Sequence, residues 1–239
     1  MTGMLASVAN LAEARLVVDA GVDIVDLKNP AAGALGALPL PIISAIANEL
    51  AGVVPLSATV GDLPMEPAQI REAVLSTASS GVHYVKLGFF PDGDWAAVIG
   101  ELAGTALKHI RLIAVLFGDL EPDIAILNSL AQAGFSGAML DTADKRRGSL
   151  TAVCSPAFLK DFVAATHDLG LMCGLAGSLR ERDIPALMPL RADYLGFRGA
   201  LCHRHARDAE LDVRQVTRIK LSMGAGKATE PRKNCFDLA

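Results

Sequence analysis

The stretch GVDIVDLKNP at residues 21–30 decides the fold. Gly21 stands where a helix would end in a left-handed residue, and the apolar run Val22–Lys28 has the length of a buried strand. Asn29-Pro30 closes that run, because the residue before a proline is restricted to extended or turn conformations. A helical spacing of apolar residues follows over Pro39–Leu50. The stretch therefore predicts one strand–helix unit.

The same unit recurs along the chain, and a glycine often precedes the apolar run. The predicted strands are Met4–Val8, Val22–Lys28, Val53–Val60, His83–Phe89, Arg111–Phe117, Ser136–Leu140, Leu171–Leu175 and Asp193–Phe197. The predicted helices are Asn10–Ala20, Pro39–Leu50, Pro67–Ser79, Trp95–Leu107, Asp123–Ala133, Pro156–Leu169, Glu181–Met188 and Leu211–Met223.

Strands that alternate with helices in this way indicate an α/β protein with a parallel sheet. The eight units predict a single (β/α)8 TIM barrel over residues 1–223, and residues 224–239 are expected to form a flexible tail. An open, doubly wound sheet is the alternative. The first strand–helix junction lacks Gly-x-Gly-x-x-Gly, which weakens the dinucleotide-binding form of that alternative.

Composition indicates a globular protein with a large core. Of the 239 residues, 51% are hydrophobic, 20% are charged and only 5% are aromatic, so aliphatic side chains must fill the core. The formal charge of −4 and the short basic clusters Lys145–Arg147 and His203–Arg207 argue against a nucleic-acid partner. No apolar run approaches the roughly 20 residues of a membrane span, and no secretory signal is evident. A cytoplasmic protein without a membrane partner is expected.

Metal and disulfide sites are not expected. The four cysteines lack Cys-x-x-Cys spacing, which favours reduced thiols. His203 and His205 lie two residues apart, but no carboxylate follows at ligand spacing.

Polar residues follow the apolar cores of several predicted strands, where barrel enzymes hold their active sites. Asp26 and Lys28 are two residues apart and share one face of a strand. Lys86 stands between two aliphatic residues that would face the helices, which turns Lys86 inward. Asp141 follows the sixth strand. We expect these four side chains to surround one small pocket.

Lysines in such a pocket have a chemical use. Burial and a second cation both lower the pKa of an ammonium group, and the neutral amine can attack a carbonyl to form a Schiff base. The carboxylates of Asp26 and Asp141 oppose that pKa shift but can carry protons. The alternative is a buried ion network without catalytic function. The pattern favours Lys28 as the Schiff-base lysine.

The predicted loops after strands seven and eight consist of small residues, and barrels often bind phosphate there. Gly177 and Ser178 follow strand seven, and Gly199 and Ala200 follow strand eight. Arg198 would supply a cation. Simple turn chemistry is the alternative reading of the glycines. A small phosphorylated sugar is the expected ligand.

A family resemblance becomes specific on these residues. The chain resembles the (5-formylfuran-3-yl)methyl phosphate synthases, which make the furan precursor of methanofuran, over about residues 4–222. The motifs that carry the resemblance are Asp23–Pro30 with Gly33–Ala37, Ser57–Asp62, Tyr84–Gly88, Met139–Ala143, Leu175–Ser178 and Gly196–Ala200. The loop at residues 89–94 and the segment after Gly118 are more compact than the archaeal pattern, and the tail has no clear counterpart.

The resemblance implies a barrel related to class I aldolases, acting as a lyase without cofactor or metal. Two molecules of glyceraldehyde 3-phosphate would condense to 4-(hydroxymethyl)-2-furancarboxaldehyde phosphate, with loss of phosphate and water. The resemblance makes Lys28 the Schiff-base lysine and Lys86 the proton acceptor, and it adds Asp26, Asp141 and Lys145 to the catalytic site.

Ser57 and Thr59, at the end of the third strand, are expected to contact the rest of the substrate.

Two other functions stay open: a Schiff-base aldolase with an open-chain sugar phosphate as its product, and a non-catalytic barrel that binds a phosphorylated metabolite. Barrels of this size often associate, so a homo-oligomer is compatible with the sequence, although no interface can be named.

Overall fold

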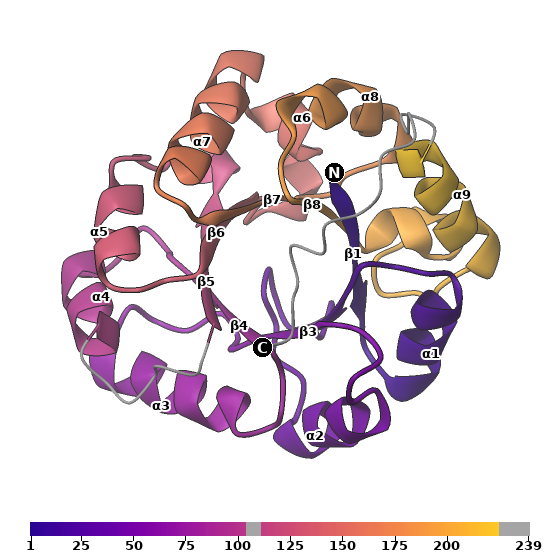
Figure 1. Ribbon diagram of the computed structural model, residues 1–239, viewed down its shortest axis with the longest axis horizontal. Coiled ribbons are helices and arrows are strands. Elements are labelled where there is room, and N and C mark those ends of the chain that lie inside the picture. Colours follow the sequence, from indigo (N-terminus) through magenta and orange to yellow (C-terminus); the bar gives the residue numbers. More distant parts are fainter. Residues whose placement is uncertain (104–110, 225–239) are drawn as a thin grey trace.

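The computed structural model describes residues 1–103 and 111–224, which form a closed parallel barrel (Figure 1). Its eight strands pair in chain order, and the last pairs with the first. The strands are β1 (Gly3–Val8), β2 (Ile24–Leu27), β3 (Leu56–Thr59), β4 (Tyr84–Gly88), β5 (Arg111–Phe117), β6 (Gly137–Asp141), β7 (Met172–Leu175) and β8 (Tyr194–Phe197). The predicted (β/α)8 barrel is confirmed.

A ring of helices surrounds the strands, as the view along the barrel axis shows (Figure 1). The helices are α1 (Leu11–Asp19), α2 (Leu40–Glu49), α3 (Pro67–Ala78), α4 (Trp95–Ala103), α5 (Ile126–Gln132), α6 (Leu150–Val153), α7 (Pro156–Asp168), α8 (Ile184–Leu187) and α9 (Val213–Gly224). Several helix starts follow from the local sequence. Asn10 accepts a hydrogen bond from Glu13 N at the start of α1, and Ser155 accepts one from Phe158 N at the start of α7.

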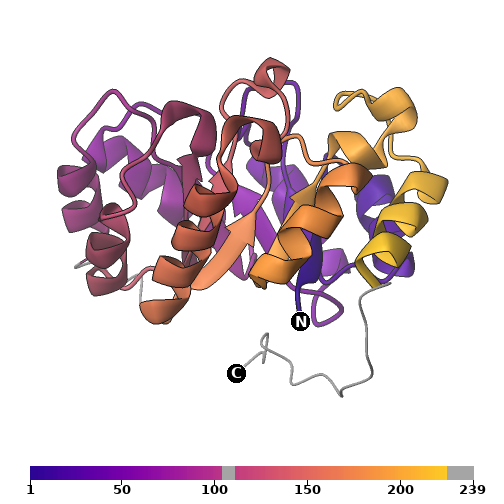
Figure 2. The ribbon, with the colours of Figure 1, turned by 90° about the horizontal axis from the view of Figure 1, so that it is seen from above.

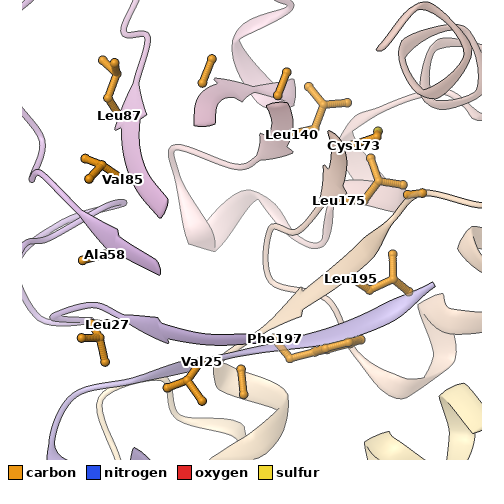
Figure 3. Packing of buried hydrophobic residues seen from close by; sticks show 14 of the residues in the cluster. Val25, Leu27, Ala58, Val85, Leu87, Leu140, Cys173, Leu175, Leu195 and Phe197 are labelled. Carbon is orange, nitrogen blue, oxygen red and sulfur yellow. The ribbon is translucent and has the colours of Figure 1, made fainter. Parts of the chain in front are cut away.

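Side chains alternate between the inside and the outside of the barrel, as the strand geometry requires. Val25, Leu27, Val85 and Leu87 point outward and pack under the helices (Figure 3). The interior is filled by a separate apolar cluster that includes Leu5, Ile24, Tyr84, Ile113, Val115, Met139 and Tyr194. Because Ile24 and Tyr84 point inward, Asp26 and Lys86, two residues further on, also point inward.

The structure differs from the predicted elements in the second half of the chain. The predicted helix Glu181–Met188 is broken into a 3-10 turn, the short α8 and a second 3-10 turn, with prolines at the start of the latter two. The short helix α6 was not predicted. The predicted helix Trp95–Leu107 is described only to Ala103, and the predicted tail lies outside the described residues from position 225 onward, because Gly224 still belongs to α9.

The strand register places the polar side chains next to one another at one end of the barrel. Ser7 pairs with Asp26 across β1 and β2, and Asp26 pairs with Ser57 across β2 and β3. Lys86 stands beside Thr59 on the neighbouring strand. In side view, the loops that follow the strands rise at the edge opposite the N-terminus (Figure 2). No helix among the described residues is long and apolar enough to cross a membrane.

Candidate active site

A cavity of about 300 Å³ opens at the ends of the strands. Its walls come from loops that follow strands distant in sequence, and they include Lys28, Lys86, Asp26, Asp141 and Lys145. The structure thus brings together the five residues expected to form the catalytic site. Their placement follows from strand alternation and from the closed barrel, which directs every strand end to one rim.

Asp26 and Lys86 form a buried ion pair on the floor of the cavity. Lys86 Nζ lies 2.7 Å from Asp26 Oδ1. Ser57 Oγ donates to the same carboxylate oxygen at 2.6 Å, and Ser7 Oγ donates to Oδ2 at 2.8 Å. Burial alone would raise the pKa of Asp26, but the charges of Lys86 and Lys28 outweigh it, so this pKa falls below its ordinary value. Asp26 is therefore an anion that holds Lys86 in place.

Lys28 stands immediately after β2, and its Nζ lies 3.6 Å from Asp141 Oδ2. Burial lowers the pKa of its ammonium group to about 8, and the positive charges of Lys145 and Lys86 act in the same direction. Asp141 and Asp26 oppose the change without cancelling it. Lys28 consequently has the neutral amine available near neutral pH, as a Schiff-base nucleophile requires.

Asp141 lies between Lys28 and Lys145. Lys145 Nζ contacts Asp141 Oδ1 and the carbonyl oxygen of Thr142, and Thr142 N donates to the same carboxylate oxygen at 2.7 Å. Burial would raise the pKa of Asp141, but the neighbouring charges of Lys145 and Lys28 hold this pKa well below its ordinary value. Asp141 is therefore charged throughout the neutral range.

The carboxylate of Asp119 fixes the loop that carries Lys145. Asp119, which is buried, accepts hydrogen bonds from Ala143 N at 2.7 Å and from Asp144 N at 2.9 Å. Asp144 in turn caps the 3-10 turn that begins at Lys145. Because both anchors act on the backbone, the position of Lys145 does not depend on its own side-chain contacts alone.

Glycine is required where the β7 loop bends into the cavity. Gly177 has φ +103°, and a Cβ there would lie 2.9 Å from Thr142 N. Ser178 also adopts a left-handed conformation, with φ +47°. Gly177, Ser178 and Gly199 line the cavity, whereas Ala200 is buried behind it. Within the described part of the chain, the backbone N–H groups of Gly177, Ser178 and Gly199 have no hydrogen-bond acceptor, so they are available to an anionic ligand.

Arg198 was expected to offer its side chain to phosphate, and the structure engages that side chain elsewhere. Its Nη1 and Nη2 contact both carboxylate oxygens of Glu13, at 2.5 and 3.2 Å. The remaining N–H groups donate to carbonyl oxygens of Ser7, Arg207 and Ala209. A guanidinium has five N–H donors, and all five are used. Arg198 therefore braces the β8 loop against α1.

Ser57 and Thr59 do not reach the cavity lining, although both were expected to contact substrate. Ser57 is 2% exposed and donates to Asp26. Thr59 is fully buried, and its hydroxyl donates to the carbonyl oxygen of Gly36 at 3.0 Å. Their roles are to orient the carboxylate of Asp26 and to fix the loop after β2.

The cavity also contains residues that the sequence analysis did not select, notably Ser7, Arg180, His205 and Arg207. Arg180 follows the predicted Gly177-Ser178 loop by two positions, so the same argument about loop cations could have found it. Ser7 had no such signal, since only the register of β1 against β2 shows that it faces Asp26. Among the residues that the structure describes, no group of three or more His, Cys, Asp or Glu side chains could hold a metal ion.

Comparison with known proteins gives a consistent result. The model of the 4-HFC-P synthase family matches residues 4–220. A Methylorubrum extorquens protein, named provisionally as a (5-formylfuran-3-yl)methyl phosphate synthase, is 40% identical over 225 residues, covering 93% of this chain and 92% of the relative. The (5-formylfuran-3-yl)methyl phosphate synthase of Methanocaldococcus jannaschii is 34% identical over 231 residues, covering 91% and 97%.

Solved structures support the fold. Phosphoribosyl anthranilate isomerase from Thermotoga maritima superposes with a TM-score of 0.68 at 16% identity, covering 94% of this chain and all of that one. A 3-hexulose-6-phosphate synthase superposes with a TM-score of 0.60 at 18% identity, covering 90% and 99%. At such low identity, these similarities concern the barrel alone.

Proposed function

The chain belongs to the 4-HFC-P synthase family, and we propose that it condenses two molecules of glyceraldehyde 3-phosphate to 4-(hydroxymethyl)-2-furancarboxaldehyde phosphate, through an imine on Lys28. One observation carries the proposal. Lys28 is 7% exposed, its pKa is lowered to about 8, and it shares a cavity with two further lysines and two carboxylates. A structural ion pair would not need an ammonium group whose charge is so disfavoured.

The first step uses the neutral amine of Lys28. At pH 7, about a tenth of a group with a pKa of 8 is neutral, which suffices for attack on a triose carbonyl. Loss of water from the carbinolamine then gives the iminium. The ammonium group of Lys145, which shares the carboxylate of Asp141 with Lys28, is the group that can supply a proton to the departing hydroxyl. The iminium is a better electron sink than the carbonyl, so the adjacent carbon becomes acidic.

Removal of the proton from that carbon requires a base, and the family resemblance assigns it to Lys86. Lys86 donates a hydrogen bond to Asp26 in the structure, so it can accept a proton only after releasing its own. The carboxylate of Asp26 is in direct contact with Lys86 and is the group that can take this proton. The resulting enamine attacks the carbonyl of the second triose, and loss of phosphate, ring closure and dehydration build the furan. Hydrolysis of the C–N bond to Lys28 releases the product and restores the amine. Throughout, the β7 and β8 loops would hold the phosphate that the product retains.

The product identifies the reaction. We expect the purified protein and glyceraldehyde 3-phosphate alone to give a compound with the mass of the furan phosphate and near-ultraviolet absorbance, formed faster as the pH rises toward about 8, where Lys28 loses its proton. Lys28→Met should abolish this product. Lys160→Met, a change at an exposed lysine on α7, is the matched control and should not.

Other products would lead to other conclusions. An open-chain sugar phosphate, which lacks the near-ultraviolet absorbance, would identify a Schiff-base aldolase. Thermal stabilisation by the triose without any turnover would identify a binding protein. Either result would contradict the proposal.

A further inference from the structure

We propose that the guanidinium of Arg180 is the cation that binds the phosphate group of the substrate. This inference rests on the proposed function and names a residue for the phosphate end of the same cavity. Arg180 stands in the loop between β7 and α8, two positions after Ser178. It lines the cavity together with Lys28, Gly177 and Gly199.

The guanidinium of Arg180 has a buried nitrogen without a partner. Nη1 is inaccessible to solvent and makes no hydrogen bond among the described residues. Nη2 makes one long contact, 3.4 Å, with the carbonyl oxygen of His205. Within the described ranges, no carboxylate forms an ion pair with Arg180. Because a buried charged donor without a partner is costly, this arrangement indicates a ligand that completes it.

The unpartnered nitrogen lies against the β8 loop. A Cβ built on Gly199 would be 3.2 Å from Arg180 Nη1, so the guanidinium rests directly beside the backbone of that residue. The unoccupied amides of Gly199 and Gly177 are in the two loops that flank Arg180. A phosphate group placed here could accept from those amides and from the guanidinium, which matches the planar pair of donors that arginine offers to phosphate.

Among the described residues, no other cation that lines the cavity has a buried nitrogen without a hydrogen-bond partner. Arg198 uses all its donors within the chain, as described above. Lys145 contacts Asp141, and Arg146 is an exposed residue paired with Asp144. Arg207 donates through Nη2 to the carbonyl oxygen of Gly33. Within the part of the chain that the structure describes, Arg180 is thus the arginine of the cavity that has a nitrogen, Nη1, left for a ligand.

A hydrogen bond fixes the backbone of Arg180 and so the point from which its side chain extends. Arg180 N donates to Asp183 Oδ2 at 2.7 Å. The other carboxylate oxygen of Asp183 accepts from Thr151 Oγ1 at 2.6 Å and from Ser149 Oγ at 3.2 Å. Asp183 thereby ties the loop after β7 to the start of α6. A phosphate site built on this loop would be largely organised before the ligand arrives.

Arg180→Gln tests the proposal, and Arg182→Gln is the matched control, since Arg182 is exposed in the same loop and the change in charge is the same. The first measurement is binding of inorganic phosphate by calorimetry, which does not require turnover. We expect Arg180→Gln to weaken phosphate binding about ten- to a hundredfold, as for loss of a charged hydrogen-bonding pair, and Arg182→Gln to leave it unchanged. Arg180→Lys should fall between wild type and Arg180→Gln, because the charge stays and the second donor is lost.

The second measurement separates this inference from the proposed function. Borohydride trapping of the imine with glyceraldehyde, which lacks phosphate, should be the same in wild type and Arg180→Gln, whereas the KM for glyceraldehyde 3-phosphate should rise about ten- to a hundredfold. Phosphate binding that Arg180→Gln leaves intact, or no phosphate binding by wild type, would overturn the role of Arg180. If wild type forms no furan but Arg180→Gln still abolishes phosphate binding, the proposed function fails and the phosphate site stands.

Discussion

Lys28 is held in an unfavourable state by the rest of the protein. Its ammonium group is buried, and two other ammonium groups, those of Lys145 and Lys86, lie close enough to lower its pKa. Asp141 and Asp26 return only part of the lost stabilisation. The protein therefore pays in stability at neutral pH for an amine that loses its proton easily.

Lys28→Met should stabilise the folded protein at pH 7. The fall in the pKa of Lys28 from 10.5 to about 8 corresponds to about 3 kcal/mol. Below pH 8 both the folded and the unfolded chain carry the charge, and the folded state bears the full cost. Between pH 8 and 10.5 the unfolded chain binds more protons, so wild-type stability rises with pH and the advantage of the variant disappears. Urea unfolding at pH 7, 9 and 10.5 measures this. Lys160→Met is the control, and a pH-independent gain, or a loss at pH 7, would contradict the expectation.

The inward direction of Asp26, Lys28 and Lys86 could be predicted from sequence because strand alternation is a local property. The ion pair between Arg198 and Glu13 could not be predicted from the sequence. The two residues lie 185 positions apart, and only barrel closure brings β8 next to β1. The contact between Ser57 and Asp26 could not be predicted for a similar reason, because it depends on the register of β2 against β3.

At the scale of elements, a small residue in β7 makes room for a large one in β8 inside the barrel. Gly174 in β7 faces the ring of Tyr194 in β8, and both are on the inside of the barrel. A Cβ at position 174 would lie 2.3 Å from Tyr194 Cζ and 2.5 Å from its hydroxyl oxygen. The glycine is therefore needed for space, not for backbone conformation. The ring of Tyr194 fills the barrel below the cavity.

Gly174→Ala should destabilise the protein by about 1–3 kcal/mol, because the ring of Tyr194 is 1% exposed and has no free volume to move into. Thermal unfolding measures the effect. Gly100→Ala in α4 is the matched control. A Cβ there meets nothing within 4 Å, and alanine favours helix, so that change should stabilise by up to about 1 kcal/mol. Equal effects of the two changes would show that the contact with Tyr194 does not matter.

The order of strands and helices could be read from the sequence, but the short elements between β6 and β8 could not. Residues 181–190 have the apolar content of one helix, yet Pro185 and Pro189 divide the segment into short turns. These turns place Asp183 beneath Arg180. The irregular segment thus organises the end of the cavity that Arg180 lines, where we place the phosphate group.

At the scale of the whole molecule, the closed barrel separates two apolar clusters. One fills the space between strands and helices, and the smaller one fills the barrel interior up to the level of Asp26 and Lys86. The charged groups therefore sit on an apolar floor and face one open mouth, which is the condition that lowers the pKa of Lys28. Association into a homo-oligomer stays a prediction.

Borohydride trapping followed by intact-mass analysis and peptide mapping tests the central claim most directly. With glyceraldehyde 3-phosphate, we expect one adduct with the mass of the reduced imine, located on the peptide that contains Lys28. It should be absent from Lys28→Met and present in Lys160→Met. An adduct located on Lys86 or Lys145 in the wild type, an adduct that persists in Lys28→Met, or no adduct at all would contradict the assignment of the imine to Lys28.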